Sequence, residues 1–370
     1  MARLPGFNAG KTGSFCSLCA ECDGTRIRRP AAMTQLLRLP VIHSRLSRSG
    51  PKLGFWAKLG RNQRRMPAAP NQGVHRFAIF TACCTVLLLT AGALVTSNDA
   101  GLAVPDWPLS YGSLMPPMIG GIFYEHGHRM IATLVGTLTI VLAVWLSLVE
   151  PRRWVRRLGW AALGLVIAQG LLGGLTVLLY LPPAVSSAHA TLAQLYFITV
   201  LSLAVFTSPW WQSDLEVRED AGSPALRTLA VATTASIVVQ LILGAAFRHN
   251  LFGIVPHLVG AGVAAVMVIL TGVAIKKRFR DFRPLRRAMV LLHATFGTQI
   301  LLGGVTYWVV FYASRNDPQP LPLFISVTVA HVVVGALTLA ASMLVTLTCY
   351  RILRPSRAME VSRSPERAAI

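Results

Sequence analysis

Charged residues are scarce in this sequence. Only 13% of the 370 residues are charged, whereas a soluble globular domain carries roughly 25%. Hydrophobic residues make up 54% of the chain, and its mean hydropathy is +0.56. This composition excludes an ordinary soluble protein and predicts a polytopic membrane protein.

Acidic residues are scarcer still, with 14 Asp and Glu against 35 Lys and Arg. A formal net charge of +21 is also typical of proteins that bind nucleic acid. Here, however, the basic residues gather in the tails and in alternate loops, as in the cytoplasmic segments of membrane proteins. We therefore expect membrane lipid around the chain and no nucleic-acid partner.

Cysteines number only six. Three fall inside apolar runs, where a thiol simply packs. The other three form the motif CSLCAEC, whose spacing suits a metal or cluster but lacks an evident fourth ligand. The two groups are Cys83, Cys84 and Cys349, and Cys16, Cys19 and Cys22. We interpret the second group as an incidental feature of the tail.

Residues 1–74 lack a long apolar run, and the first 65 hold 13 Lys and Arg against two acids. The segment is therefore expected to be a disordered basic tail and not a secretory signal. An organellar transit peptide and an over-long gene start, with Met33 or Met66 as the initiator, are the alternatives.

Eight apolar runs are long enough to cross a bilayer. They predict an all-α membrane protein whose eight transmembrane helices form two tandem four-helix bundles, over 75–212 and 213–350, followed by a basic tail, 351–370. The loops after even-numbered runs hold 13 Lys and Arg and the other loops hold two, which places both termini in the cytoplasm or matrix. The runs span about 77–97, 126–149, 159–180, 189–210, 227–247, 255–275, 288–312 and 323–350.

The two halves share a repeated motif. AQGLLGGLTVLLY at 168–180 matches TQILLGGVTYWVV at 298–310, and VQLILGAAF at 239–247 is a looser third copy. Small residues of this kind allow close helix packing, which is sufficient to explain the glycines. They could also admit a flat macrocycle between helices.

Four histidines stand near the starts of the second, fourth, sixth and eighth runs. His128, His189, His257 and His331 are separated by 61, 68 and 74 residues, spacings that fit two membrane crossings and place all four on one side. Facing imidazoles in a helical bundle are typical of haem iron ligation. A zinc or copper site, and histidines that merely pack, are the alternatives.

Glu125 breaks the symmetry of the four helices. It precedes His128 by three residues, so the two side chains share a helix face. Ser186, Ile254 and Thr328 occupy that offset in the other helices. The carboxylate is a candidate catalytic group, or a structural one that offsets a nearby arginine or caps the helix.

The remaining polar residues are assigned minor roles. Three arginines on the histidine side are candidates to pair with haem propionates: Arg129, Arg248 and Arg315. Five other histidines are interpreted as non-ligands, with His43 and His75 placed in the tail, His126 off the His128 face, His249 in a loop and His293 near the opposite membrane face.

Several motifs, taken in order, resemble the heme A synthase family over about 75–350. They are Glu-x-x-His-Arg at 125–129 after DAGLAVPDWP, HATLAQ at 189–194, HLVGA at 257–261 and HVVVGALT at 331–338. The resemblance implies oxidation of the C8 methyl of haem O, in two steps, to the formyl of haem A. It also implies a cytoplasmic membrane or mitochondrial inner membrane location.

The same resemblance implies roles for particular residues. Glu125 would be the essential acid, and His128 and His189 would flank the substrate haem O. His257 and His331 would be the axial ligands of a haem b cofactor. The implied partners are the farnesyltransferase that makes haem O and the terminal oxidase that receives haem A, and oligomerisation is left open.

One departure from the family pattern concerns the first loop on the histidine side. Many bacterial members carry a cysteine pair there, but residues 98–124 hold none, which places this chain in a cysteine-free subgroup. Two other functions compete with the enzyme. A di-haem cytochrome b that only carries electrons leaves Glu125 unexplained, and a non-haem transporter or assembly factor leaves the histidines idle.

Overall fold

The computed structural model describes residues 71–313 and 321–355, and within them eight helices are long and apolar enough to cross a membrane. This confirms the predicted all-α membrane fold. The helices are α2 (Gln72–Ser97), α3 (Gly120–Val149), α4 (Arg153–Leu178), α5 (Pro183–Thr207), α7 (Leu226–Arg248), α8 (Ile254–Arg278), α9 (Arg283–Trp308) and α10 (Pro322–Ile352).

Local sequence sets several helix ends. The Asn71 side chain caps α2 by accepting a hydrogen bond from the Val74 N–H at 3.1 Å. Proline occupies the first turn of α5, α9 and α10, where a missing N–H costs nothing. Helix α3 begins at Gly120, earlier than the predicted 126, so Glu125 lies within the helix.

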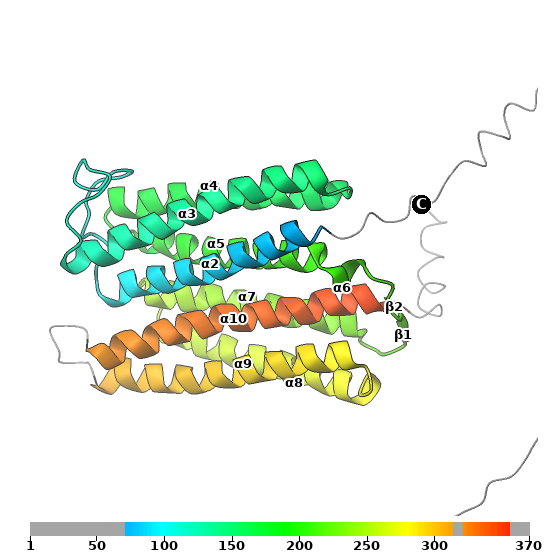
Figure 1. Cartoon of the computed structure of the whole chain (residues 1–370). Helices are drawn as coiled ribbons and strands as arrows, with labels where there is room; N and C mark the ends of the chain where they lie inside the picture. Colours follow the sequence, from blue (N-terminus) through cyan, green and yellow to red (C-terminus); the bar gives the residue numbers. More distant parts are fainter. Residues whose placement is uncertain (1–70, 314–320, 356–370) are drawn as a thin grey trace, which may run out of the picture. The chain divides into compact units, whose positions relative to one another are not determined.

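The long helices run roughly parallel to one another (Figure 1), and their contacts join them into two rings of four. In the first half α2 contacts α3 and α5, and α4 contacts α3 and α5. In the second half α7 contacts α8 and α10, and α9 contacts α8 and α10. This arrangement fits the expected tandem bundles.

The two rings meet along α2, α5, α7 and α10, with contacts of α10 to α2 and of α5 to α7. Each half has its own apolar core, and each core also includes residues of the other half. Ile198 of α5 packs in the core of the second half, and Ala336 and Ala340 of α10 pack in the core of the first half. Buried hydroxyl pairs add specificity, such as Ser97 with Thr328 at 2.9 Å across the two halves.

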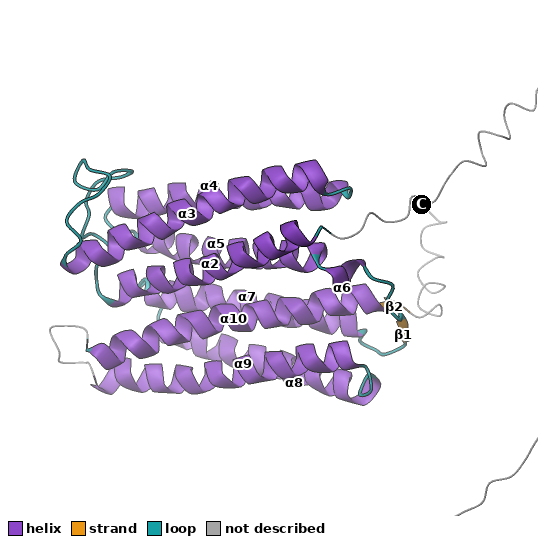
Figure 2. Ribbon diagram, in the orientation of Figure 1, coloured by secondary structure: helices purple, strands orange, loops and turns teal. Residues whose placement is uncertain are grey.

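The segment between the halves and the start of the C-terminal tail are more ordered than the sequence predicts. A short helix α6 (Pro209–Gln212) leads to strand β1 (Arg218–Asp220), which pairs in parallel with β2 (Leu353–Pro355) (Figure 2). Arg351 donates to the Trp211 carbonyl at 2.8 Å beside this pair. The tail is thus tied to the linker at the end of the bundle opposite the histidines.

Candidate functional site

Each of the four histidine rings lies against a glycine of the preceding long helix. A Cβ placed on any of these glycines would come within 2.9–3.2 Å of the ring Cε1 atom. A larger residue there would push the ring away, so glycine is required for this close approach. The pairs are Gly92 with His128, Gly173 with His189, Gly244 with His257 and Gly303 with His331.

His257 and His331 form a facing pair in the second half. Their ring centres are 6.3 Å apart and the rings are nearly perpendicular, at 80°. A histidine nitrogen binds a metal at about 2.0–2.1 Å, so two imidazoles on opposite sides of one metal ion have ring centres about 6–6.5 Å apart. The observed separation therefore fits one metal ion between the rings.

His128 of α3 and His189 of α5 lie in the first half, each against its glycine. The His128 Nδ1 and His331 Nδ1 atoms are buried and have no hydrogen-bond partner among residues 71–313 and 321–355. Buried polar atoms without partners are rare, and a bound group that fixes the ring is one explanation. Each half therefore holds two imidazoles and at least one orphaned ring nitrogen.

The donor set indicates which metal group fits. No cluster of three or more His, Cys, Asp or Glu occurs in the described part of the chain. Zinc and copper sites use three or four protein ligands, whereas haem iron brings four nitrogens of its own and needs only axial ligands. Two-histidine sites bordered by glycines thus fit haem better than a bare metal ion.

Glutamine side chains contact three of the four rings, a feature that the sequence analysis missed. Gln169 Nε2 lies 3.0 Å from His189 Nδ1, and Gln240 Nε2 lies 3.0 Å from His257 Nδ1. Gln299 Nε2 lies 3.2 Å from His331 Nε2. The signal was present in the repeated motifs, where a glutamine stands four residues before each of these glycines.

Glu125 is buried, with only 4% of its surface exposed. One carboxylate oxygen accepts a hydrogen bond from the Val104 N–H at 2.8 Å, and the other pairs with Arg129 at 2.6 Å. The carboxylate therefore has one of the structural roles predicted for it, because it balances the charge of a nearby arginine. Its place one turn from His128 also keeps it beside the first histidine pair.

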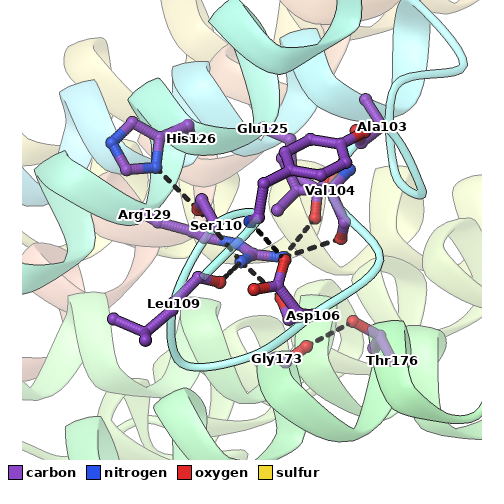
Figure 3. A network of polar contacts seen from close by, with 11 residues as sticks. Ala103, Val104, Asp106, Leu109, Ser110, Glu125, His126, Arg129, Gly173 and Thr176 are labelled. Atoms are coloured by element: carbon purple, nitrogen blue, oxygen red, sulfur yellow. Dashed lines mark hydrogen bonds and ion pairs between the residues drawn. The ribbon is translucent and has the colours of Figure 1, made fainter. Parts of the chain in front are cut away.

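Arg129 holds the loop between α2 and α3 over the bundle end (Figure 3). Its guanidinium donates to the carbonyls of Asp106, Leu109 and Val104 at 2.7, 2.8 and 3.1 Å. These bonds and the ion pair to Glu125 occupy both terminal nitrogens. The structure thus gives Arg129 the role of anchoring the loop. To pair with a haem propionate, its N–H groups would have to bond the propionate in addition to these partners.

Arg248 lies where the two halves meet. It donates to Ser97 Oγ at 2.7 Å, and Ser97 in turn bonds Thr328 of α10. Its neighbour His249 caps α7, where burial and then the Arg248 charge lower the pKa of the imidazole to about 4. His249 is therefore neutral at neutral pH. The third candidate, Arg315, lies outside the described residues.

The other histidines fall into different settings. His75 is not in a tail as predicted but within α2, where Nδ1 lies 2.9 Å from the Ala204 carbonyl of α5. His126 bonds Ser110 in the loop at 2.8 Å, and His293 bonds the Met289 carbonyl of its own helix at 2.8 Å. His43 and the cysteines of the CSLCAEC motif lie outside the described residues.

Asp106 folds the loop on itself. Its carboxylate accepts hydrogen bonds from the N–H groups of Gly112 and Tyr111 at 2.8 and 2.7 Å, and these hold the pKa of Asp106 below its usual value. The loop is thus supported above the unfolded pKa of Asp106, and the support is lost as the pH falls through the lowered one. We expect acidification to lower the protection of the amides at 103–113 against hydrogen exchange, measured relative to their intrinsic rate at each pH.

Replacing Asp106 with asparagine should remove this acid step, because an amide does not titrate. The protection of the amides at 103–113 would then be lower at neutral pH and would change little on acidification. An acid step that persists in the Asp106→Asn variant would contradict the assignment to this carboxylate.

The fold and the site define a class: a multi-pass membrane protein of two helical rings, each holding two imidazoles at the same end of the bundle. The chain belongs to the COX15-CtaA family, described as cytochrome oxidase assembly protein, whose model matches residues 120–349. This match confirms the family resemblance found in the sequence.

Three curated relatives are all named heme A synthase. The protein of Symbiobacterium thermophilum is 31% identical over 179 residues, which is 46% of this chain and 58% of that protein. That of Lysinibacillus sphaericus is 30% identical over 187 residues, 49% of this chain and 59% of the relative. That of Methylobacterium nodulans is 34% identical over 149 residues, 34% of this chain and 40% of the relative. The chain thus matches less than two thirds of each relative's length.

Proposed function

We propose that this protein is a heme A synthase, an oxidoreductase that converts the C8 methyl group of haem O into the formyl group of haem A. The observation that carries the proposal is the asymmetry between two otherwise similar histidine pairs. Among the described residues, only the first-half pair has a buried carboxylate, Glu125, one helical turn away. A protein that merely carried electrons would not need an acid at one site alone.

The two halves receive different haems in this proposal. His128 and His189 hold the substrate haem O in the first half, about residues 75–212. His257 and His331 are the axial ligands of a haem b cofactor in the second half, about 213–350. The 6.3 Å ring separation of the latter pair supports a resident group between them.

The chemistry requires a proton acceptor near the methyl group. Conversion of a methyl to a formyl adds one oxygen atom and removes four electrons and four protons when water supplies the oxygen. Glu125 is held in place by Val104 and Arg129 and can accept a proton or stabilise positive charge on the reacting carbon. Haem b supplies a route for electrons when it is bound.

The surroundings of the site complete the proposal. Of the two candidate arginines that the structure describes, Arg248 is the better placed for a propionate, because it lies between the halves and bonds a single serine hydroxyl. We place the protein in the cytoplasmic membrane, or the mitochondrial inner membrane, with both termini on the cytoplasmic or matrix side. A protohaem farnesyltransferase would supply the substrate, and a terminal oxidase would receive the product.

The test is the identity of the porphyrins bound to the purified protein. We expect protein co-expressed with a haem O source to yield haem b together with haem O and haem A on extraction and mass spectrometry. A di-haem electron carrier would contain haem b alone. A colourless protein would contradict both functions.

A further inference from the structure

A pocket with basic walls opens at the end of the bundle opposite the histidines. It lies where α3 ends and α4 begins, and its volume is about 410 Å³. Small-molecule sites have volumes of roughly 300–1,000 Å³. The lining residues, which we call the basic pocket, include three arginines and no acid: Ser147, Arg153, Arg156, Arg157 and Trp160.

Two helices form the walls of the basic pocket. Arg153, Arg156, Arg157 and Trp160 stand at positions that share one face of α4, because residues three and four apart are neighbours on a helix. The Trp160 indole N–H donates to the Ser147 Oγ of α3 at 3.0 Å and so ties the two walls together. Three guanidinium groups are therefore held along one side of the cavity.

The positive charge of the basic pocket is not balanced within the described part of the chain. Arg152, just outside it, shows what a balanced arginine looks like, since it bonds both Glu150 carboxylate oxygens at 2.7 and 2.9 Å. None of the ion pairs between described residues involves the three pocket arginines. Like charges gathered in one cavity favour an anionic ligand, and guanidinium groups match the geometry of phosphate oxygens.

The basic pocket lies at the depth of lipid headgroups. Ser147 follows His128 by 19 residues in α3, which is about 28 Å of helix at roughly 1.5 Å per residue. The hydrocarbon core of a bilayer is about 30 Å thick. Trp154 and Trp160 are 47% and 50% exposed here, as is typical of tryptophans at a membrane surface.

Apolar surface continues from the basic pocket along the same face of α4. Gly164, Ile167 and Leu171 follow Trp160 at steps of four, three and four residues. Ile167 and Leu171 are exposed, and a Cβ on Gly164 would meet no atom within 4 Å. Open apolar surface next to a cationic pocket suits a lipid, whereas a free phosphate ion would make no use of it.

We propose that the basic pocket binds the phosphate headgroup of an acidic phospholipid, with an acyl chain of that lipid against Gly164 and Ile167. Basic pockets between transmembrane helices are known to bind such headgroups. Arg153, Arg156 and Arg157 bond the phosphate oxygens, and the lipid bridges α3 and α4. The inference goes beyond the proposed function and is independent of it, because no haem takes part.

The experiment is native mass spectrometry of the purified full-length protein, incubated with phosphatidylglycerol or with phosphatidylcholine of the same acyl chains. We expect the wild type to retain phosphatidylglycerol more tightly. Combined Arg156→Gln and Arg157→Gln should weaken that binding about 30-fold, from the usual contribution of each basic residue near an acidic lipid surface. Arg157→Gln alone changes one exposed side chain and should weaken it about fivefold.

The start of α9 offers a matched control. Arg283, Arg286 and Arg287 repeat the spacing of the pocket arginines at the same positions of the helix, but Val290 stands where α4 has Trp160. Combined Arg286→Gln and Arg287→Gln removes the same charge from the same end of the bundle. This variant should bind phosphatidylglycerol like the wild type.

Three results would overturn the proposal. Equal losses in the two double variants would mean that the arginines attract acidic lipid only through their overall charge. Equal retention of phosphatidylglycerol and phosphatidylcholine by the wild type would show that the headgroup is not recognised. Binding of inorganic phosphate that depends on Arg156 and Arg157, without retention of phosphatidylglycerol, would assign the pocket to the free ion.

Discussion

Replacing Glu125 with glutamine is expected to lower haem A formation by about 10²- to 10⁴-fold, the usual contribution of a positioned acid or base. Both haems should remain bound, because the four histidines are untouched. Glutamine keeps the size of the side chain and can still accept the hydrogen bond from the Val104 N–H, which lies 2.8 Å from the carboxylate. What it loses is the negative charge and the ability to take a proton.

Arg129 provides the control for this variant. Arg129→Gln breaks the ion pair and the bonds to the loop carbonyls but leaves the carboxylate beside His128. If Glu125 acts chemically, Arg129→Gln should retain much more activity than Glu125→Gln, measured as haem A per bound haem by liquid chromatography. Equal losses would assign Glu125 to holding the loop, and normal output from Glu125→Gln would reject a catalytic role.

Replacing His257 with alanine is expected to lower the haem b content of the purified protein at least tenfold. The proposed site has only two protein ligands, His257 and His331. Among the described residues no third His, Cys, Asp or Glu lies near them to replace the lost imidazole. Haem O bound in the first half should be retained, because its ligands belong to the other helical ring. Pyridine haemochrome spectra with mass spectrometry of the extracted porphyrins measure both quantities.

His293 offers a matched control in the same half. It lies in α9, packs near Gly272 and bonds the Met289 carbonyl of its own helix. His293→Ala removes an imidazole of the same size without touching the facing pair, so its haem b content should stay near that of the wild type. A similar loss in both variants would point to general instability, and an unchanged content in His257→Ala would refute the ligand assignment.

The spans could be predicted from the sequence because hydropathy is a local property. All eight predicted spans exist, and each predicted start lies within six residues of the observed helix start. The larger differences arise where polar residues or glycines belong to a helix. Residues 120–125 resemble a loop by their glycines, yet Gly120 begins α3 and carries Glu125 into the helix. His75, a polar residue before the apolar run, likewise lies within α2.

Contacts between distant segments were less predictable. The linker at 211–226 and the C-terminal tail show no hydrophobic alternation, so nothing in them predicted the pairing of β1 with β2. The roles of Arg129 and Asp106 in holding the loop could not be predicted from the sequence either. Their partners are mostly backbone carbonyls and N–H groups, which every residue has and which no sequence pattern marks.

The sequence by itself determined that the chain crosses the membrane eight times, that four histidines share one end, and that one of them has a carboxylate a turn away. These follow from hydropathy, spacing and helical periodicity, which depend only on near neighbours. The tertiary structure alone decided which glycine underlies which ring, which glutamines reach the imidazoles, and how Arg129 ties the loop to Glu125. The physical reason is that such contacts depend on how each helix is rotated against its neighbour, and close packing of side chains across the whole bundle sets that rotation.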